Sequence, residues 1–189
     1  MIKIAVFASG TGSNFDAILE NIHQGKLQAE LALMVCDKPA ALVVEKAKKA
    51  NIPSFVFNPK DYPSKAAYDQ AILEACRKAG VEMIILAGYM RIVSEILLRA
   101  YPNKIINIHP SLLPAFKGKD AIKQAYDYGV KVMGVSVHYV NEDLDGGDII
   151  AQKAFACDGM SLSEAECNIH AIEHQLYPQT IQKLIEEER

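Results

Sequence analysis

The sequence predicts a single Rossmann-like α/β domain over residues 1–189, with a mostly parallel, twisted sheet flanked by helices. Short β-branched apolar segments alternate with longer amphipathic ones, which is the pattern of βαβ units around a parallel sheet. A chain of 189 residues has the length of one domain, and the sequence has no internal repeat, linker or shift in composition. The pattern changes after Pro114, where we expect an antiparallel strand region and a long C-terminal helix.

Before Pro114, strands and helices are expected to alternate. The expected strands, each a short apolar segment, are Ile2–Phe7, Glu30–Val35, Ser54–Phe57, Met83–Leu86 and Lys104–Asn107. The expected helices are Ser13–His23, Ala41–Ala50 and Lys65–Ala79. In the last helix, apolar residues three or four positions apart mark one buried face, and Gly80 fits a C-terminal cap.

After Pro114 we expect a helix near Asp120–Tyr128 that ends at Gly129, followed by strands at Val132–Val140 and Ile149–Phe155. Ser161 and Glu164 have the spacing of a capping box. They should begin a long helix that reaches the C-terminus with an interruption near Pro178. Strands ending near residues 8, 87 and 107 would direct their C-terminal ends to one sheet edge, where open α/β sheets bind ligands.

Composition argues against several classes of protein. A formal net charge of −3 gives no attraction to nucleic acid or to an anionic membrane. The four cysteines show no CxxC or Cys/His spacing, so we expect neither a disulfide framework nor a metal site. The apolar stretches are far shorter than the ~20 residues of a membrane span, and no signal peptide is recognisable. We therefore expect a cytoplasmic protein with no metal, nucleic-acid partner or membrane association.

A glycine-rich loop, Ser9-Gly10-Thr11-Gly12-Ser13-Asn14, follows the first expected strand and leads directly into a helix. Glycines permit a sharp turn, and a helix N-terminus favours an anion. The loop is not a Walker A motif, and Phe15 stands where a dinucleotide fingerprint has its third glycine. The loop predicts a phosphate site; a tight turn capped by Ser13 is the alternative.

A second feature is the segment Leu86–Val93, where Gly88 breaks a buried strand. It leaves an aromatic residue, a methionine and an arginine at the mouth of the strand. This mixture suits a slot for a flat heteroaromatic ligand, with backbone groups of residues 91–93 reading its edge. The alternative is a core strand followed by an ordinary surface loop.

The most informative feature is the segment Asn107–Pro114 (Asn-Ile-His-Pro-Ser-Leu-Leu-Pro), followed later by Leu144-Asp145-Gly146-Gly147. Asn107 and His109 leave the same side of one strand, and the prolines stiffen the chain after them. A carboxylate on the glycine-hinged loop would reach the imidazole and favour its protonated form. Amide donor, titratable group and anionic orienter together form an acyl-transfer site. A plain turn role for Asp145 is the alternative.

These segments occur in order and, with Glu173-His174, resemble the phosphoribosylglycinamide formyltransferase family over essentially the whole chain. The Asn107–Pro114 segment is typical of formyl-folate enzymes in general, and the glycine-rich loop narrows the resemblance to this member. The resemblance implies transfer of a formyl group from 10-formyltetrahydrofolate to the amine of 5-phosphoribosylglycinamide in de novo purine biosynthesis. These two small molecules are the expected partners, and we expect a monomer or a homodimer.

The resemblance also implies catalytic roles for Asn107, His109 and Asp145. As the amine attacks the formyl carbon, Asn107 and the imidazolium of His109 would stabilise the oxyanion. Asp145 would orient His109 and help to move the amine proton through water. The N-terminal half would then bind phosphate, while the C-terminal half would bind folate and carry the catalysis.

Binding residues are implied in the same way. The phosphate would be bound by Gly12, Ser13 and Asn14, with Glu173 on the ribose and His170 at the edge of that pocket, where relatives often have lysine or arginine. The folate would contact Met90, Arg91, Ile92, Val93, Asn107 and the loop from Asn141 to Asp145, with Lys65 near its glutamate tail. Lys117 and Asp148 stand where many relatives have proline.

Two other interpretations stay open. A formyltetrahydrofolate hydrolase or the catalytic domain of a methionyl-tRNA formyltransferase shares the His-Pro-Ser segment, although such enzymes usually carry an additional domain. A non-catalytic nucleotide-binding Rossmann module explains the phosphate loop but gives Asn107, His109 and Asp145 no role. Consumption of 10-formyltetrahydrofolate without glycinamide ribonucleotide would indicate the hydrolase.

Overall fold

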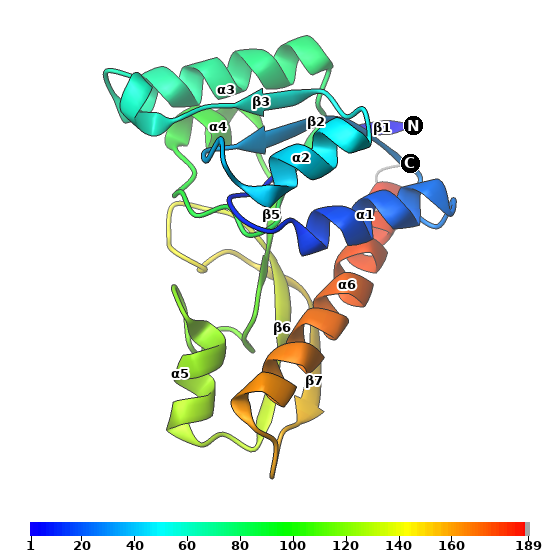
Figure 1. The fold of residues 1–189 in the computed structure, drawn as a ribbon, viewed down its shortest axis with the longest axis vertical. Coiled ribbons are helices and arrows are strands. Elements are labelled where there is room, and N and C mark those ends of the chain that lie inside the picture. Colours follow the sequence, from blue (N-terminus) through cyan, green and yellow to red (C-terminus); the bar gives the residue numbers. More distant parts are fainter. Residues whose placement is uncertain (188–189) are drawn as a thin grey trace.

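Strands and helices alternate through most of the chain in a computed structural model that describes residues 1–187 (Figure 1). The strands are β1 (Ile2–Phe7), β2 (Ala29–Cys36), β3 (Ser54–Val56), β4 (Met83–Leu86), β5 (Ile105–His109), β6 (Val132–Tyr139) and β7 (Ile149–Ala156). The α-helices are α1 (Ser13–His23), α2 (Leu42–Lys49), α3 (Lys65–Ala79), α4 (Glu95–Ala100), α5 (Ala121–Tyr128) and α6 (Leu162–Glu187). A short 3₁₀ helix, η1, spans Pro59–Asp61.

All seven strands form one sheet in the order β3-β2-β1-β4-β5-β6-β7. The pairs from β3 to β5 are parallel, while β6 and β7 are antiparallel to their neighbours. The predicted α/β fold, with an antiparallel C-terminal region and a long last helix, is therefore confirmed. Because β1, β4 and β5 are adjacent and parallel, their C-terminal ends share one edge of the sheet, as expected.

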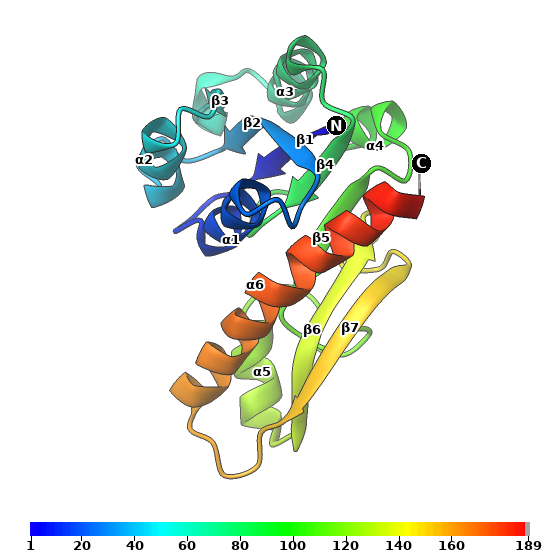
Figure 2. The same cartoon turned by 90° about the vertical axis from the view of Figure 1, so that its right-hand side faces the viewer.

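The sheet is covered on both faces (Figure 2). Successive side chains of a strand point to opposite faces. Ile4 and Val6 of β1 accordingly belong to one apolar cluster, and Ala5 and Phe7 belong to the other. The first cluster includes residues of α1, α2, α5 and α6, and the second includes residues of α3 and α4. Burial on both faces explains why β1 is apolar from Ile4 to Phe7.

The helix ends that were predicted from capping residues are confirmed. Gly80 and Gly129 cap α3 and α5 in the left-handed conformation, with φ of 69° and 82°. At the start of α6, Ser161 N donates to Glu164 Oε2 (2.7 Å) and Glu164 N donates to Ser161 Oγ (3.3 Å), which is the expected capping box.

Two expectations about elements were wrong. No interruption occurs at Pro178, because α6 continues through it to Glu187. A helix-internal proline costs ~3 kcal/mol, and the buried Tyr177 and Ile181 on either side offset that cost by packing on the sheet. Strand β5 also extends past Asn107 to His109. The expected continuation of the helix to the C-terminus concerns residues 188–189, outside the described residues. Within residues 1–187, no helix combines the length and apolarity that crossing a membrane requires.

Candidate functional site

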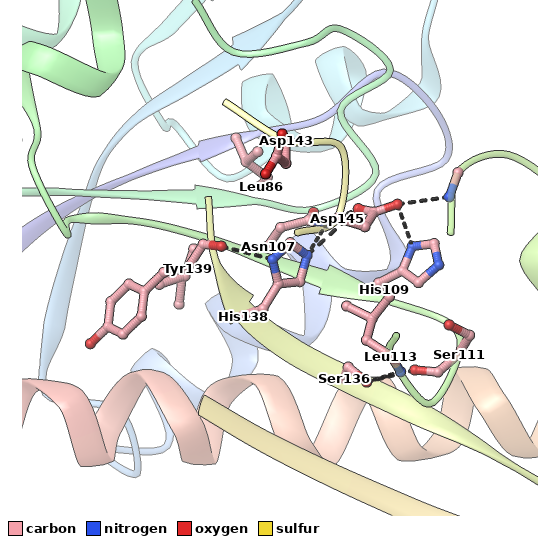
Figure 3. Close-up of polar contacts among 12 residues, drawn as sticks. Leu86, Asn107, His109, Ser111, Leu113, Ser136, His138, Tyr139, Asp143 and Asp145 are labelled. Carbon is pink, nitrogen blue, oxygen red and sulfur yellow. Dashed lines mark hydrogen bonds and ion pairs between the residues drawn. The ribbon is translucent and has the colours of Figure 1, made fainter. Parts of the chain in front are cut away.

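The three predicted catalytic residues lie together at the C-terminal end of β5 (Figure 3). Asn107 and His109 are two positions apart on β5, so their side chains leave the same face. Asp145 lies on the loop between β6 and β7 and reaches both of them. Its Oδ1 is 3.5 Å from Asn107 Nδ2, and its Oδ2 is 3.4 Å from His109 Nδ1. Donor groups from two residues thus converge on one carboxylate, at distances longer than a strong hydrogen bond.

The loop geometry explains how Asp145 points inward. Asp145 itself has a positive φ of 47°, and Gly118 N donates to its Oδ2 at 2.8 Å. The two following glycines are needed for space: a Cβ at Gly147 would lie 1.8 Å from Tyr139 O, and one at Gly146 would lie 2.6 Å from Asp143 Cβ. Gly146 and Gly147 are therefore required because other parts of the chain approach them closely. The left-handed backbone conformation of the turn belongs to Asp145.

The pKa of Asp145 is lowered. Burial alone raises the pKa, because it penalises the charged form, but the contacts of the carboxylate outweigh that effect. Those contacts are with His138, the amide of Gly118 and the nearby His109. Asp145 is therefore a carboxylate near neutral pH.

His109 is surrounded by acceptors. It is 5% exposed, and its Nε2 lies 2.8 Å from the carbonyl oxygen of Phe116. A carbonyl can only accept, so Nε2 carries a proton. Its Nδ1 faces the carboxylate of Asp145. Both ring nitrogens of His109 therefore face acceptor groups.

His138 belongs to this cluster, although the sequence did not single it out. It pairs directly with Asn107 across β5 and β6. Its Nδ1 lies 2.8 Å from Tyr139 O, and its Nε2 lies 3.1 Å from Asn107 Nδ2 and 3.6 Å from Asp145 Oδ1. The signal available was its alternation with Ser136, which places both on the face that Asn107 and His109 share.

The chain after His109 is fixed by side chains of β6 and β7. Ser136 Oγ accepts from Leu113 N (3.0 Å) and donates to Ser111 O (2.7 Å), and Gln152 Nε2 donates to Leu113 O (3.0 Å). The segment that the prolines were predicted to stiffen is thus also held by hydrogen bonds to β6 and β7. These bonds fix the position of the chain that leads to Phe116.

The glycine-rich loop meets the C-terminal helix. Asn14 Nδ2 donates to Glu173 Oε2 at 3.2 Å, and His170 Nδ1 lies 3.0 Å from the same oxygen. Both Asn14 and Glu173 are buried, whereas the side chain of His170 is 53% exposed. The hydrogen bond to Glu173 raises the pKa of His170 despite partial burial. Residues 159 positions apart therefore form one polar cluster.

The alternative role of Ser13 as a cap was wrong. Gly12 caps α1 with φ of 75°, and within residues 1–187 no side-chain cap hydrogen bond forms there. A Cβ at Gly12 would lie 2.7 Å from Val43 Cγ2, so only glycine fits. The free first-turn amides, with the positive end of the helix dipole, suit an anion.

The segment after β4 presents an exposed corner. Met90 and Ile92 are 67% and 68% exposed, while Val93 is buried. The side chain of Arg91 is paired through Nε with Asp37 Oδ2 at 2.7 Å. Backbone groups of residues 91–93 make no hydrogen bond to any residue within 1–187 and are free for a ligand edge.

Two other predicted folate contacts are engaged elsewhere within the chain. Lys65 Nζ pairs with Asp69 Oδ2 at 2.9 Å on α3, and Asn141 Oδ1 accepts from Asp143 N at 3.0 Å. Neither contact brings these residues to Asp145 or Arg91. Within residues 1–187, no group of three or more His, Cys, Asp or Glu side chains is arranged to hold a metal ion.

Residues 2–181 match the family model described as formyl transferase. The chain belongs to the formyl transferase family. The resemblance identified from the sequence and the predicted enzyme class are thus confirmed. The chain is 55% identical over 186 residues to the phosphoribosylglycinamide formyltransferase of Bacillus subtilis (strain 168), covering 98% of this chain and 95% of the relative.

Two further members of the family show how widely the similarity extends. A crystal structure of glycinamide ribonucleotide transformylase 1 from Geobacillus kaustophilus superposes with a TM-score of 0.95 at 52% identity, covering 97% of this chain and 98% of that one. The trifunctional purine biosynthetic protein adenosine-3 of Bos taurus is 39% identical over 181 residues, which are 95% of this chain and 18% of that protein.

Proposed function

We propose that this formyltransferase transfers the formyl group of 10-formyltetrahydrofolate to the amine of 5-phosphoribosylglycinamide, a step of de novo purine biosynthesis. The observation that carries the proposal is the convergence of Asn107 Nδ2 and His109 Nδ1 on the carboxylate of Asp145. Donors that meet at one point suit a developing oxyanion, and an adjacent carboxylate suits a proton leaving an amine. The names of the relatives support this choice of acceptor.

The chemistry follows from these positions. When the amine nitrogen attacks the formyl carbon, the electron pair of the carbonyl moves to its oxygen. Asn107 Nδ2 and His109 Nδ1 make only long contacts with Asp145. Their N–H groups are therefore available to donate to this oxygen. Removing one such donor costs about 10²–10³ in rate in comparable enzymes. Asp145 accepts the amine proton, directly or through water, and returns it to the leaving folate nitrogen as the oxyanion re-forms the carbonyl and the bond from the formyl carbon to that nitrogen breaks, which releases tetrahydrofolate.

Other roles follow from the same geometry. Gly12, Ser13 and Asn14 would bind the acceptor phosphate, and Glu173 and His170 from α6 would complete that side of the site. Residues 90–93, with Lys65 and Asn141, would bind the folate. The proposed acceptor site then combines the N-terminal loop with residues of the C-terminal helix α6. The expected division into an N-terminal phosphate-binding half and a C-terminal folate-binding, catalytic half is therefore too simple for this proposal. The cytoplasmic location and the monomeric or homodimeric state stay predictions.

A two-substrate assay tests the proposal. Consumption of 10-formyltetrahydrofolate should require glycinamide ribonucleotide, and formylated ribonucleotide should appear in equal amount. Consumption without the ribonucleotide would instead indicate a hydrolase. Ribonucleotide binding without formyl transfer would indicate a non-catalytic module.

A further inference from the structure

We propose that Asp37 is a positioning residue for the formyl-donor side of the site, because its buried carboxylate holds the corner that follows β4. The inference rests on the proposed function, which assigns this corner to 10-formyltetrahydrofolate. Asp37 directly follows β2, Ser9 follows β1, and Met90 and Arg91 follow β4. These strands are consecutive and parallel in the sheet, so their C-terminal ends meet at one edge. Asp37 therefore reaches across the end of β1 to the corner.

The contacts form a continuous path. Asp37 is 2% exposed, its Oδ1 accepts from Ser9 Oγ at 2.5 Å, and its Oδ2 accepts from Arg91 Nε at 2.7 Å. Ser9 Oγ in turn accepts from Met90 N at 2.9 Å. The path runs from Arg91 through Asp37 and Ser9 to Met90. The carboxylate of Asp37 thus binds the side chain of Arg91 directly and, through Ser9, the main chain of Met90.

The corner has few other anchors. Within residues 1–187, the amide of Met90 is the single main-chain group of residues 89–93 with a hydrogen bond. The exposed Met90 and Ile92 make little contribution to the core. A loop with few buried contacts and few backbone bonds is held in one conformation mainly by the interactions it does make. Here those interactions lead to Asp37, together with burial of Val93 and the edge-to-face packing of Tyr89 on Phe7, with ring centroids 5.3 Å apart.

The same contact orients Arg91. Its Nε is bound to Asp37, and no other residue within 1–187 accepts a hydrogen bond from its guanidinium. The side chain is 41% exposed, so its terminal nitrogens are accessible to an anionic group of a ligand. Hydrogen bonding to Asp37 also raises the pKa of Arg91, which keeps it charged. Losing Asp37 would leave the cation without a fixed direction.

The acceptor side has its own anchors and should be spared. Ser9 N donates to Gly88 O at 3.0 Å, and Val43 N donates to Gly10 O at 3.2 Å. These backbone bonds hold the glycine-rich loop independently of the contact between the Ser9 hydroxyl and Asp37. The structure therefore predicts a defect confined to the folate: weaker donor binding with unchanged acceptor binding.

The test compares Asp37→Ala, Asp37→Asn and Ser9→Ala with a matched control, Glu95→Gln. The control breaks the exposed ion pair between Glu95 and Arg99 on α4, close to the same corner. For each protein we would measure KM for both substrates, kcat, the melting temperature and the Kd for tetrahydrofolate by calorimetry. We expect Asp37→Ala to raise the folate KM and Kd at least about tenfold, since hydrogen bonds to charged groups have this magnitude. Asp37→Asn should recover part of the loss, Ser9→Ala should shift the same constants less, and the control should stay near wild type.

The outcomes separate the two hypotheses. If wild type does not bind tetrahydrofolate, the proposed function fails and this role of Asp37 fails with it. If wild type binds but the variants bind equally well, or if both KM values rise together, the proposed function stands and the positioning role is wrong. Should Asp37→Ala not fold, Asp37→Asn and Ser9→Ala decide by the same titration.

Discussion

The catalytic cluster and the acceptor-side cluster both pair a histidine with a carboxylate, yet they surround the histidine differently. His109 is 5% exposed and has acceptors on both ring nitrogens. His170 has one carboxylate partner, and its side chain is 53% exposed. The first arrangement fixes the position of the ring, whereas the second leaves the ring half exposed to solvent. Under the proposed function, the first histidine is a fixed donor for catalysis and the second is an adjustable charge for acceptor binding.

The largest effect should come from removing the enclosed histidine. His109→Ala deletes a proposed oxyanion donor, and kcat should fall about 10²–10⁴-fold. The KM for the acceptor should change little, because His109 makes no contact with Asn14 or Glu173. Steady-state kinetics with both substrates measures this. A kcat within a few-fold of wild type would contradict the catalytic role that separates His109 from His170.

Glu173→Ala should act on binding instead. It removes the buried group that joins Asn14 to His170, so the acceptor KM should rise about tenfold or more. The kcat at saturating acceptor should change much less. Acceptor titrations by activity and by calorimetry measure the effect. Comparable losses in kcat and KM would show that the clusters are not separable.

His138→Ala tests whether Asn107 depends on its neighbour. Without the ring nitrogen at 3.1 Å, the Asn107 amide keeps only its 3.5 Å contact with Asp145 and is held less firmly. Misplaced catalytic groups commonly cost up to about 10²-fold, so we expect a 10- to 100-fold lower kcat. His138→Gln, which offers another acceptor, should recover part of this activity. A purely structural role would lower the melting temperature without such recovery.

The smallest effect should be the pH response of the acceptor side. Glu173 raises the pKa of His170, so the ring is positively charged below that raised value and attracts phosphate. As the pH rises through the pKa of His170, the charge is lost and the acceptor KM should increase a few-fold. His170→Lys keeps its charge and should flatten the profile between about pH 7 and 9. Identical profiles for the two proteins would exclude this role.

The sequence revealed local features well. Strand β1 is apolar from Ile4 to Phe7 because both faces are buried there, and Gly80 caps α3 because only glycine adopts φ of 69° without strain. Asn107 and His109 were placed correctly because strand alternation fixes their common side. Helix α4 was missed because it has only six residues and is positioned by packing of Leu97.

Features that depend on distant partners were not predictable. Asp37 forms hydrogen bonds with Ser9 and Arg91, which lie 28 and 54 positions away in the sequence. Nothing in the sequence next to Asp37 indicates that it is buried. His138 contacts Asn107 from 31 positions away through antiparallel pairing, whose register becomes visible only once β6 is placed. Pro178 was expected to break α6 because the local rule ignores the tertiary packing that retains the helix.

The most direct test of the central claim is the rate of formyl transfer by Asp145→Asn, with binding of both small molecules measured on the same preparation. Asparagine preserves the size of the side chain but neither accepts the amine proton nor carries the charge that faces His109. We predict at least about a 10³-fold loss of product formation, in line with removing acid–base and electrostatic assistance together. Tetrahydrofolate and glycinamide ribonucleotide should still bind within a few-fold of wild type. Turnover close to wild type would contradict the account.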